Sequence, residues 1–379
     1  MAILGTLIEQ VRGVSYKPED LHTTLNENSV TLLRANNIKD GKLNFDDVVY
    51  VDKRKVSEKQ LLKSGDILIC ASSGSKELVG KAAYVAEDMA ITFGTFCKVV
   101  RPKTECPQYI GHFFNSPYYR ERIANAAAGA NINNIRNEHI DVLEIAWPSL
   151  EEQQDAVAVL DKVIELIAQR KEQLTKLDQL IKSRFIELFG DPKANNRAWR
   201  MNTFADICSV RQGLQIPISK RLTRYEEGCY EYITVAYLHG SKEREYIKNP
   251  KSTVICTEND ILMTRTGNTG MVITNVAGVF HNNFFLIDFD RTRYNKVFLA
   301  EYLNLDLIQA EIKRKAGTST IPDLNHGEFY AISIYEPPIE LQNQFAVFVE
   351  QTDKSKVAIQ QSLDKLELLK KSLMQEYFG

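Results

Sequence analysis

Several features that would place this chain in a common class are missing. The 379 residues include six cysteines, which are Cys70, Cys97, Cys106, Cys208, Cys229 and Cys256. They form no Cys-x-x-Cys pair and the six histidines do not cluster near them, so we expect free, buried thiols rather than a zinc site. No apolar run approaches the roughly 18 residues that span a membrane, and the first residues lack the basic flank of a signal peptide. These absences predict a cytoplasmic protein without membrane contact.

Motifs for ATP-driven chemistry and for methyl transfer are missing as well. There is no Gly-x-x-x-x-Gly-Lys-Ser/Thr phosphate loop, which excludes an ATP motor of that class. A DNA amino-methyltransferase needs a Gly-rich cofactor turn and an Asn/Asp-Pro-Pro-aromatic motif, and the doubled proline at residues 337–338 has neither the amide nor the aromatic partner. No Ser/His/Asp, Cys/His or nuclease-type grouping can be argued from spacing. We therefore expect no catalytic residue, no cofactor and no metal.

Charge is nearly balanced in total, but its distribution is uneven. The formal net charge is −2, from 47 Lys and Arg against 49 Asp and Glu. These counts are 18 to 18 in residues 1–144 and 18 to 15 in residues 193–335, whereas residues 145–192 and 336–379 give 6 to 9 and 5 to 7. The balance argues against strong indiscriminate binding to nucleic acid, but it is compatible with a local basic patch.

The most informative feature that is present is an internal repeat. Residues 145–190 recur at residues 334–379 with a constant offset of 189 and no gap. Thirteen of the 46 aligned positions are identical, and nine of these lie in the last 17 residues of each copy. Both copies begin with a Pro-x-x-Glu-x-Gln motif and end in Phe-Gly. Chance convergence does not explain this pattern, which indicates a tandem duplication.

Each copy predicts one long helix, because neither contains a Gly or Pro between its opening segment and its final Gly. In the first copy, apolar residues recur at alternating four- and three-residue steps, the spacing of a coiled-coil seam. These residues are Val157, Leu160, Ile164, Ile167, Leu174, Ile181, Phe185 and Leu188. In the second copy the same step is kept by Ile359, Leu363, Leu366, Leu373 and Tyr377.

Two equal units in one chain are most simply related by a pseudo-two-fold axis, which would make the two helices antiparallel partners. Polar Lys171 and Asp178 interrupt the first seam and would fix the register of the pair. The alternative is that each helix lies on the surface of its own domain. We favour the pair, because helices of this length need a partner along them.

A globular stretch precedes each helix, and local signals repeat in the same order in the two stretches. Strands are predicted at residues 65–69 and 259–263, each after a polar turn that contains Asp, and further core strands at residues 95–100 and 283–287. A helical stretch follows each, at residues 113–128 and 299–316, and then a loop of small polar residues. The predicted fold class is α+β, with two pseudo-two-fold-related α/β domains separated by an antiparallel pair of long coiled-coil helices.

On these features the chain resembles the specificity subunits of type I restriction-modification systems, and the resemblance covers essentially its whole length. It rests on the motifs Pro148 to Gln153 and Pro337 to Gln342, the Phe-Gly helix ends, the Asp-Ile-Leu strand starts and the small-residue loops after Ala128 and Ala316. The resemblance implies target recognition domains at residues 1–146 and 193–335, and spacer helices at residues 147–192 and 336–379. Each domain would read one half of an asymmetric, bipartite DNA site.

The family also implies partners. Double-stranded DNA would be the ligand, and the helices would dock DNA adenine methyltransferase subunits, expected to number two, with restriction and translocase subunits in the full complex. Two other readings stay open: a two-lobed protein-interaction adaptor without catalytic activity, and a specificity subunit of a related system whose partner fuses methylation and cleavage. Salt dependence distinguishes DNA from protein binding, because phosphate contacts make affinity fall steeply with ionic strength.

Loop position and residue type nominate the DNA contacts, since Arg suits guanine, Asn suits adenine, and hydroxyls and Lys suit phosphates. In the first domain the candidates are Arg34, Asn36, Asn37, Ser73, Lys76, Asn131 and Asn133. In the second domain they are Thr234, Tyr237, Arg265, Thr266, Asn268, His281, Asn282 and Thr318. The alternative for each is a turn residue that caps its own backbone.

Overall fold

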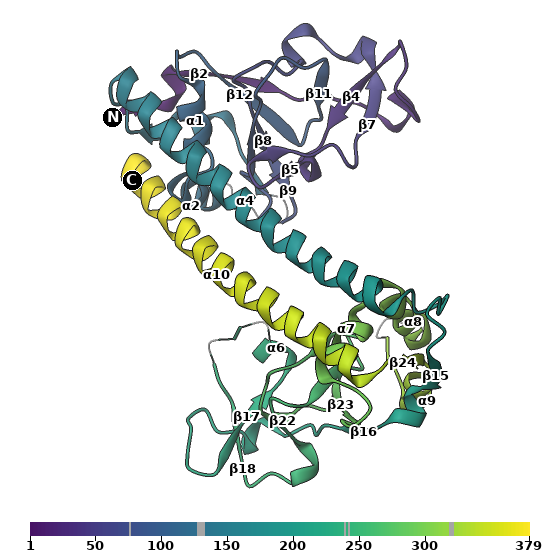
Figure 1. The fold of residues 1–379 in the computed structure, drawn as a ribbon. Helices are drawn as coiled ribbons and strands as arrows, with labels where there is room; N and C mark the ends of the chain where they lie inside the picture. The colour runs from purple at the N-terminus through teal and green to yellow at the C-terminus, as the bar shows by residue number, and fades with distance from the viewer. Residues whose placement is uncertain (76, 127–132, 239, 242, 318–321) are drawn as a thin grey trace. The chain divides into compact units, whose positions relative to one another are not determined.

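The computed structural model describes residues 1–75, 77–126, 133–238, 240–241, 243–317 and 322–379. The chain forms two compact units (Figure 1). Unit 1 comprises Met1–Lys171 and Gln360–Gly379, and unit 2 comprises Glu172–Ile359. Each unit therefore combines one globular part with segments of both long helices. Among the helices that the structure describes, none is long and apolar enough to cross a membrane.

Two four-stranded sheets build the globular part of unit 1. The first is antiparallel, in the order β10 (Ala82–Tyr84), β8 (Ile67–Cys70), β12 (Cys97–Pro102) and β2 (Ile8–Arg12). The second has the order β11 (Ile91–Phe93), β4 (Ser29–Leu33), β7 (Val49–Asp52) and β3 (Leu21–His22), with β11 parallel to β4. All four residues of β8 are buried, as expected for a strand covered on both faces.

Unit 2 repeats the order of the first sheet. In the second sheet it repeats the parallel pair and the antiparallel strand beside it, but the fourth strand lies at the opposite edge. Its first sheet has the order β21 (Val272–Ile273), β20 (Ile261–Thr264), β23 (Phe284–Phe289) and β16 (Cys208–Gln212). Its second sheet has the order β18 (Tyr246–Lys248), β17 (Cys229–Ile233), β22 (Gly278–Phe280) and β19 (Ile255–Cys256), with β22 parallel to β17. The predicted α+β fold with two repeated domains is confirmed, as are the four predicted core strands, which are β8, β12, β20 and β23.

The Asp that precedes each central strand has a structural role in both units. The buried Asp66 carboxylate accepts the backbone N–H of Lys63 at 2.8 Å and two hydrogen bonds from Arg101 at 2.7 and 2.8 Å. In unit 2 the Asp260 carboxylate accepts from the backbone N–H of Thr257 at 2.8 Å and from the Arg291 guanidinium at 2.8 Å. The repeated Asp-Ile-Leu motif thus closes a turn and anchors a neighbouring strand.

A single helical stretch is predicted after the core strands of each globular part. This prediction is wrong in one respect, because each part has two helices there. In unit 1 they are α1 (Pro107–Phe113) and α2 (Pro117–Ala126), and in unit 2 they are α7 (Lys296–Asn304) and α8 (Asp306–Ala316). The break in unit 1 comes at Ser116, whose hydroxyl accepts the Tyr119 backbone N–H, followed by Pro117, which cannot continue a helix. In unit 2 the break is Leu305, which has extended backbone.

Short elements complete each globular part. A two-stranded ribbon joins the first strand of each part to the strand before a long helix: β1 (Ala2–Ile3) with β14 (Glu144–Ile145), and β15 (Arg200–Thr203) with β24 (Ser333–Glu336). The remaining elements of the described chain include β5 (Ile38–Lys39), β6 (Lys42–Leu43), α3 (Asn137–Asp141), α5 (Phe204–Ile207), α6 (Val235–Leu238) and α9 (His326–Tyr330). The predicted burial of free thiols is confirmed, except that Cys208 is only partly buried.

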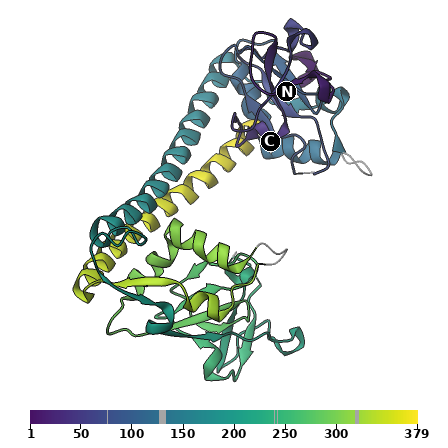
Figure 2. The same ribbon diagram turned by 90° about the vertical axis from the view of Figure 1, so that its right-hand side faces the viewer.

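The two predicted long helices are α4 (Leu150–Phe189) and α10 (Ile339–Phe378), each of 40 residues. In unit 1 the start of α4, at Leu160, shares a core with the end of α10, at Phe378. In unit 2 the end of α4, at Phe189, shares a core with the start of α10, at Phe345. Within each unit the helices therefore run side by side in opposite directions (Figure 1, Figure 2). The residues predicted for both seams are all buried or half-buried.

The polar residues that interrupt the seam pair with the opposite helix. In unit 1, Lys171 Nζ lies 3.1 Å from a Glu367 carboxylate oxygen. In unit 2, Lys356 Nζ lies 2.7 Å from an Asp178 carboxylate oxygen. Exposed pairs of this kind contribute about 0–1 kcal/mol to stability. Their contribution to the stability of the helix pair is therefore small. Their main effect would be to favour one alignment of α4 against α10.

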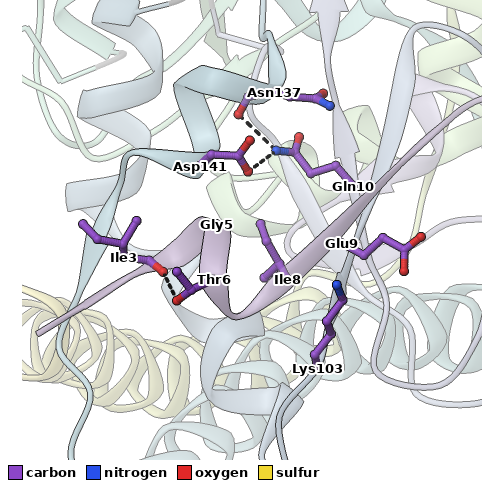
Figure 3. Close-up of a pocket in the computed structure, with 9 residues that line it drawn as sticks. All are labelled: Ile3, Gly5, Thr6, Ile8, Glu9, Gln10, Lys103, Asn137 and Asp141. Atoms are coloured by element: carbon purple, nitrogen blue, oxygen red, sulfur yellow. Dashed lines mark hydrogen bonds between the residues drawn. The ribbon is translucent and has the colours of Figure 1, made fainter.

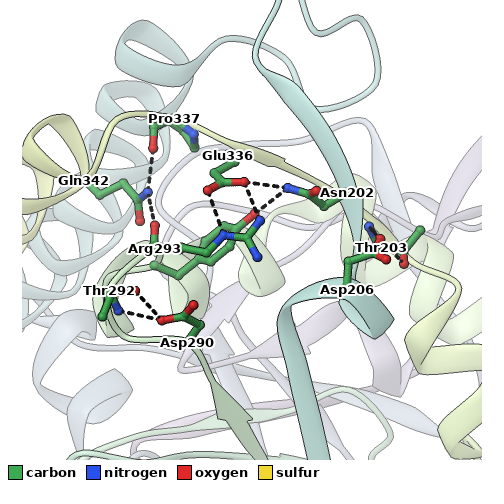
Figure 4. A network of polar contacts seen from close by, with 10 residues as sticks. Asn202, Thr203, Asp206, Asp290, Thr292, Arg293, Glu336, Pro337 and Gln342 are labelled. Atoms are coloured by element: carbon green, nitrogen blue, oxygen red, sulfur yellow. Dashed lines mark hydrogen bonds and ion pairs between the residues drawn. The ribbon is translucent and has the colours of Figure 1, made fainter.

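The repeated Pro-x-x-Glu-x-Gln motif caps the first turn of each long helix. The Gln153 amide donates to the Pro148 carbonyl at 2.9 Å, and the Gln342 amide donates to the Pro337 carbonyl at 2.8 Å. Gln342 also donates to the Arg293 carbonyl at 3.0 Å (Figure 4). Because both Gln side chains are buried, these bonds satisfy polar groups that would otherwise be desolvated at a cost.

Candidate nucleic-acid interface

In unit 1, loops that are far apart in sequence meet where the strands end. The Val14 N–H donates to the Phe93 carbonyl at 2.7 Å, and the Gly94 N–H donates to the Leu33 carbonyl at 2.9 Å. The Ala71 N–H donates to the Phe96 carbonyl at 2.8 Å, and the Ala71 carbonyl accepts from Ile135 at 2.8 Å. We call the surface formed by residues 12–15, 34–37, 71–75, 94–96 and 133–136 the strand-end edge of unit 1.

Unit 2 has the same four backbone contacts. Leu214 donates to the Phe280 carbonyl at 3.1 Å and His281 to the Ile233 carbonyl at 3.0 Å. Arg265 donates to the Asn283 carbonyl at 2.7 Å, and the Arg265 carbonyl accepts from Leu324 at 2.9 Å. The strand-end edge of unit 2 is formed by residues 212–215, 234–238, 265–270, 281–283 and 322–325. The shared contacts align residues 12–15, 94–96 and 133–136 with residues 212–215, 281–283 and 322–325, while the other two segments are one residue longer in unit 2.

Glycine is required at one position of each edge. A Cβ on Gly13 would lie 2.0 Å from the Gly94 carbonyl oxygen, and a Cβ on Gly213 would lie 2.3 Å from the His281 carbonyl oxygen. Any side chain there would force the loops apart. The Gly that follows β2 and β16 is thus explained by the close approach of two loop backbones.

The predicted contact residues of unit 1 that the structure describes lie on this edge, but several are already engaged. Arg34 lies 2.9 Å from an Asp47 carboxylate oxygen, and the Asn36 amide donates to the same carboxylate at 2.8 Å. Asn37 is fully buried, and its amide donates to the Asn44 and Asp47 carbonyls at 2.8 and 2.9 Å. Asn37 therefore organises its loop, whereas half-buried Arg34 and exposed Asn36 retain access to solvent.

The other candidates of unit 1 belong to the small-residue loops. Ser73 lies in β9 (Ser72–Ser73), which pairs with β13 (Asn133–Asn134), so Ser73 and Asn133 are backbone neighbours. The Ser73 hydroxyl accepts the Ser75 backbone N–H at 3.2 Å. Lys76 and Asn131 lie outside the described residues, as does Thr318 of the second domain.

In unit 2 the edge holds a paired arginine. Arg265 donates to the Asp323 carboxylate through two hydrogen bonds of 3.0 and 2.8 Å. No described residue offers a hydrogen-bond partner to Thr266 Oγ1 or Asn282 Oδ1, although both atoms are shielded from solvent. Buried polar atoms without partners are costly. A ligand that supplies those partners would remove the cost.

The remaining candidates of unit 2 lie on the same strand-end edge, and most of them form hydrogen bonds within it. His281 Nδ1 accepts the Asn283 backbone N–H at 3.1 Å, and burial, together with Arg221, lowers the pKa of His281. The Tyr237 hydroxyl donates to Glu231 at 2.8 Å, while the Thr234 hydroxyl accepts the Tyr237 backbone N–H at 3.1 Å. Asn268 is exposed in the loop after β20. Tyr237 and Thr234 thus shape the loop that contains α6.

Comparison with known proteins resolves the family. The sequence model of the type I restriction modification DNA specificity domain matches the chain twice, at residues 22–177 and 196–369. The two matches include both strand-end edges except for residues 12–15. The chain belongs to this family. One specificity domain thus corresponds to each half of the duplication.

Two curated relatives with the higher identities match about half of the chain, and a more distant one matches most of it. The StySPI specificity subunit of a type I restriction enzyme from Salmonella potsdam is 40% identical over 182 residues, and the EcoKI specificity subunit from Escherichia coli K12 is 38% identical over 183 residues. Each match covers 48% of this chain but 39% of the relative. A putative MjaX specificity subunit from Methanocaldococcus jannaschii is 22% identical over 374 residues, or 90% of this chain and 85% of its own.

Solved structures share the fold. The S subunit of a type I restriction-modification system from M. genitalium superposes with a TM-score of 0.60 at 14% identity, covering 100% of this chain and 95% of that one. A structure from a study of complex assembly and conformational transition in a type I system gives 0.56 at 17% identity, covering 99% and 96%.

The two specificity domains differ in chemistry at matching edge positions. Residue type and loop position did not nominate several of these positions, which are Arg12, Thr95, Phe96, Asn134 and Arg136 in unit 1. Their counterparts in unit 2 are Gln212, Asn282, Asn283, Asp323 and Asn325. Phe96 is 66% exposed, which is unusual for a large apolar residue. The signal that could have found the unit 1 positions is that each lies at the end of a strand or within two residues of one.

Proposed function

We propose that this chain is the DNA sequence-specificity subunit of a type I restriction-modification complex. The observation that supports the proposal best is the recurrence of one strand-end edge in two specificity domains, built by the same backbone contacts but carrying different side chains. Loops held by a rigid sheet are well suited to reading base edges. Because the edges differ, each domain would read a different half of an asymmetric, bipartite site.

The residues proposed for reading DNA are those of the two edges. Arg34 and Asn36 in the first domain, and Arg265, Thr266 and Asn282 in the second, would serve as direct contacts, and the atoms of Thr266 and Asn282 that lack hydrogen-bond partners support this assignment. The domains proposed as readers are residues 1–146 and 193–335. The long helices at residues 147–192 and 336–379 would set the spacer between the half-sites and dock the methyltransferase subunits.

In this proposal the chain itself is not an enzyme. It would recognise the DNA sequence, while two adenine methyltransferase subunits modify the site. Restriction and translocase subunits would join the full complex in the cytoplasm. The partner could instead be a fused methyltransferase and nuclease, as in a related system. Both alternatives predict the same DNA recognition by this chain. The adaptor alternative predicts no DNA sequence specificity at all.

The test is to co-express the chain with the methyltransferase encoded beside its gene and to map modified adenines by single-molecule sequencing. A split, asymmetric motif with a constant spacer would support the proposal and give the recognised sequence directly. Methylation at a short continuous motif would contradict the proposal. So would the absence of methylation when the methyltransferase has been shown to be active in another complex. The protein-interaction adaptor would then be the better interpretation.

A further inference from the structure

A cavity of about 630 Å³ opens at the strand-end edge of unit 1. Its lining includes Arg12, Thr95, Lys98, Asn134, Arg136 and Asn137. Except for Lys98 and Asn137, these residues belong to the edge defined above. The cavity thus lies where the ends of β2 and β8 and the segment before α3 meet.

Lys98 is the buried cation of this cavity. Its side chain projects from β12 and only 6% of the residue is exposed. The ammonium donates to the Gln10 side-chain carbonyl at 3.0 Å and to the Asn137 side-chain carbonyl at 2.8 Å. Both acceptors are neutral, and burial lowers the pKa of Lys98 to about 8. A buried ammonium without a carboxylate in contact is costly unless a further acceptor reaches it.

Further hydrogen bonds hold the Gln10 side chain, which in turn contacts Lys98. The Gln10 amide donates to the Asp141 carboxylate at 2.7 Å and to the Asn137 backbone carbonyl at 3.0 Å (Figure 3). With its N–H groups held by these acceptors, Gln10 turns its carbonyl oxygen toward Lys98. The ammonium is therefore positioned in advance, and it does not need to reorganise when a ligand enters.

The charge of the lining is predominantly positive. Arg12 and Arg136 add two exposed guanidinium groups to Lys98. The acidic residue of the lining is Glu138, whose carboxylate lies 3.2 Å from Arg136 in an exposed pair. Such a pair is weak and opens readily. Three cations against one carboxylate favour a ligand group that accepts hydrogen bonds and bears negative charge.

Unit 2 lacks this arrangement. In the sheet register, Lys98 lies opposite Arg12, and the matching pair in unit 2 is Phe285 opposite Gln212. His326 stands at the position of Asn137, the first residue of α3, because it begins α9. Among the described residues, the positions of the second domain that match Arg12, Lys98 and Asn137 therefore carry no such set of cations and acceptors.

We propose that this cavity holds an acceptor group of DNA, either a backbone phosphate or the O6 and N7 edge of a guanine, through Arg12, Lys98 and Arg136. The inference rests on the proposed function and names the contacts of its first domain. Both ligand groups present oxygen or nitrogen acceptors, and arginine and lysine bind either. The two sources differ in effect, because phosphate contacts position the protein and guanine contacts specify sequence.

The test uses the full chain in complex with its methyltransferase partner and a duplex that carries the methylated motif. The variants are Arg12→Gln, Arg136→Gln and Lys98→Met, with Lys63→Gln as the matched control. Lys63→Gln removes an exposed charge at the opposite end of β8, outside the strand-end edge. Affinity is measured from about 50 to 200 mM salt, and the methylated motif is mapped for every variant.

For a phosphate, each cavity variant makes the slope of log affinity against log salt shallower by about 1 and leaves the motif unchanged. For a guanine, the variant loses roughly 10- to 100-fold discrimination at one base pair of one half-site. The Lys63→Gln control has neither effect. Slopes and motif unchanged in Arg12→Gln and Arg136→Gln, which are surface substitutions, would overturn the inference even if Lys98→Met fails to fold. A wild-type complex that shows no split motif would instead contradict the proposed function.

Discussion

The ring of Phe378, the second-last residue, lies 5.0 Å from the ring of Tyr109 in the core of unit 1. In unit 2 the matching rings, Phe189 and Phe298, lie 4.8 Å apart. The offset of 189 that relates the two long helices also relates these partners, since Tyr109 corresponds to Phe298. Each globular part is thus completed by the Phe-Gly end of a long helix. For unit 1 that end lies more than 260 residues away in the chain.

Replacing Phe378 by Ala should destabilise unit 1 by about 3–5 kcal/mol, because the ring is 4% exposed and leaves a cavity in an aromatic cluster. Urea unfolding can follow the units separately, since Trp147 packs in unit 1 and Trp199 in unit 2. Unit 1 is followed by Trp147 fluorescence in a Trp199→Phe background. Leu368→Ala is the control, because Leu368 is 69% exposed on the same helix and its loss should stay within about 0.5 kcal/mol. A shift confined to the transition of unit 2 would contradict the assignment.

The two buried glutamines of the repeated motif should differ in their contribution to stability. Gln342 donates to two carbonyls and accepts the Asn295 backbone N–H at 2.9 Å. For Gln153, the described contacts include one such bond, to Pro148. At about 1 kcal/mol for each neutral hydrogen bond, Gln342→Ala should cost about 2 kcal/mol more than Gln153→Ala. Thermal unfolding of both variants measures the difference, and equal losses would show that the motif serves both helices alike.

Acid should weaken unit 2 through Glu336. Arg293 donates to this carboxylate through hydrogen bonds of 2.9 and 2.6 Å, and Asn202 adds one of 2.9 Å (Figure 4). The hydrogen bonds from Arg293, followed by the one from Asn202, lower the pKa of Glu336 from 4.5 to about 2. A lowered carboxyl pKa stabilises the folded state fully above pH 4.5, and this contribution is lost as the pH falls through 2.

The Glu336→Gln variant should therefore be less stable than the wild type by about 2 kcal/mol at neutral pH, the range for hydrogen bonds to charged groups. The difference should shrink between pH 4.5 and 2, as measured by urea unfolding across that range. Glu340→Gln is the matched control, because Glu340 is exposed in the first turn of α10. A difference that stays constant from pH 7 to 2 would exclude Glu336 as the cause.

Exchange of residues 1–144 for the corresponding segment of another family member should change one half of the methylated motif and leave the other half and the spacer as they were. The physical reason is that the contacts that build each strand-end edge lie within one unit. The readout is the adenine methylation map of the chimaera with its own methyltransferase. If both halves of the motif change together, the two domains do not read independently.

The sequence by itself determined the elements that depend on local chemistry and on repetition. The absence of Gly and Pro across 40 residues and the three- and four-residue apolar steps specify α4 and α10. The Asp-Ile-Leu motifs mark the starts of β8 and β20, because a turn that contains Asp precedes a short apolar run. The duplication itself was visible from identities at a constant offset. These features need no knowledge of which segments meet in space.

The tertiary structure decided which side chains share a site. Lys98 reads in sequence as one polar residue in an apolar strand, and only its contacts with Gln10 and Asn137 make it part of a cationic cavity. The edges are likewise assembled by hydrogen bonds between loops about 20 to 80 residues apart, such as Val14 with Phe93. Local patterns specify backbone conformation, but they do not encode these pairings, because a loop side chain is positioned by the strand beside it rather than by its neighbours in sequence.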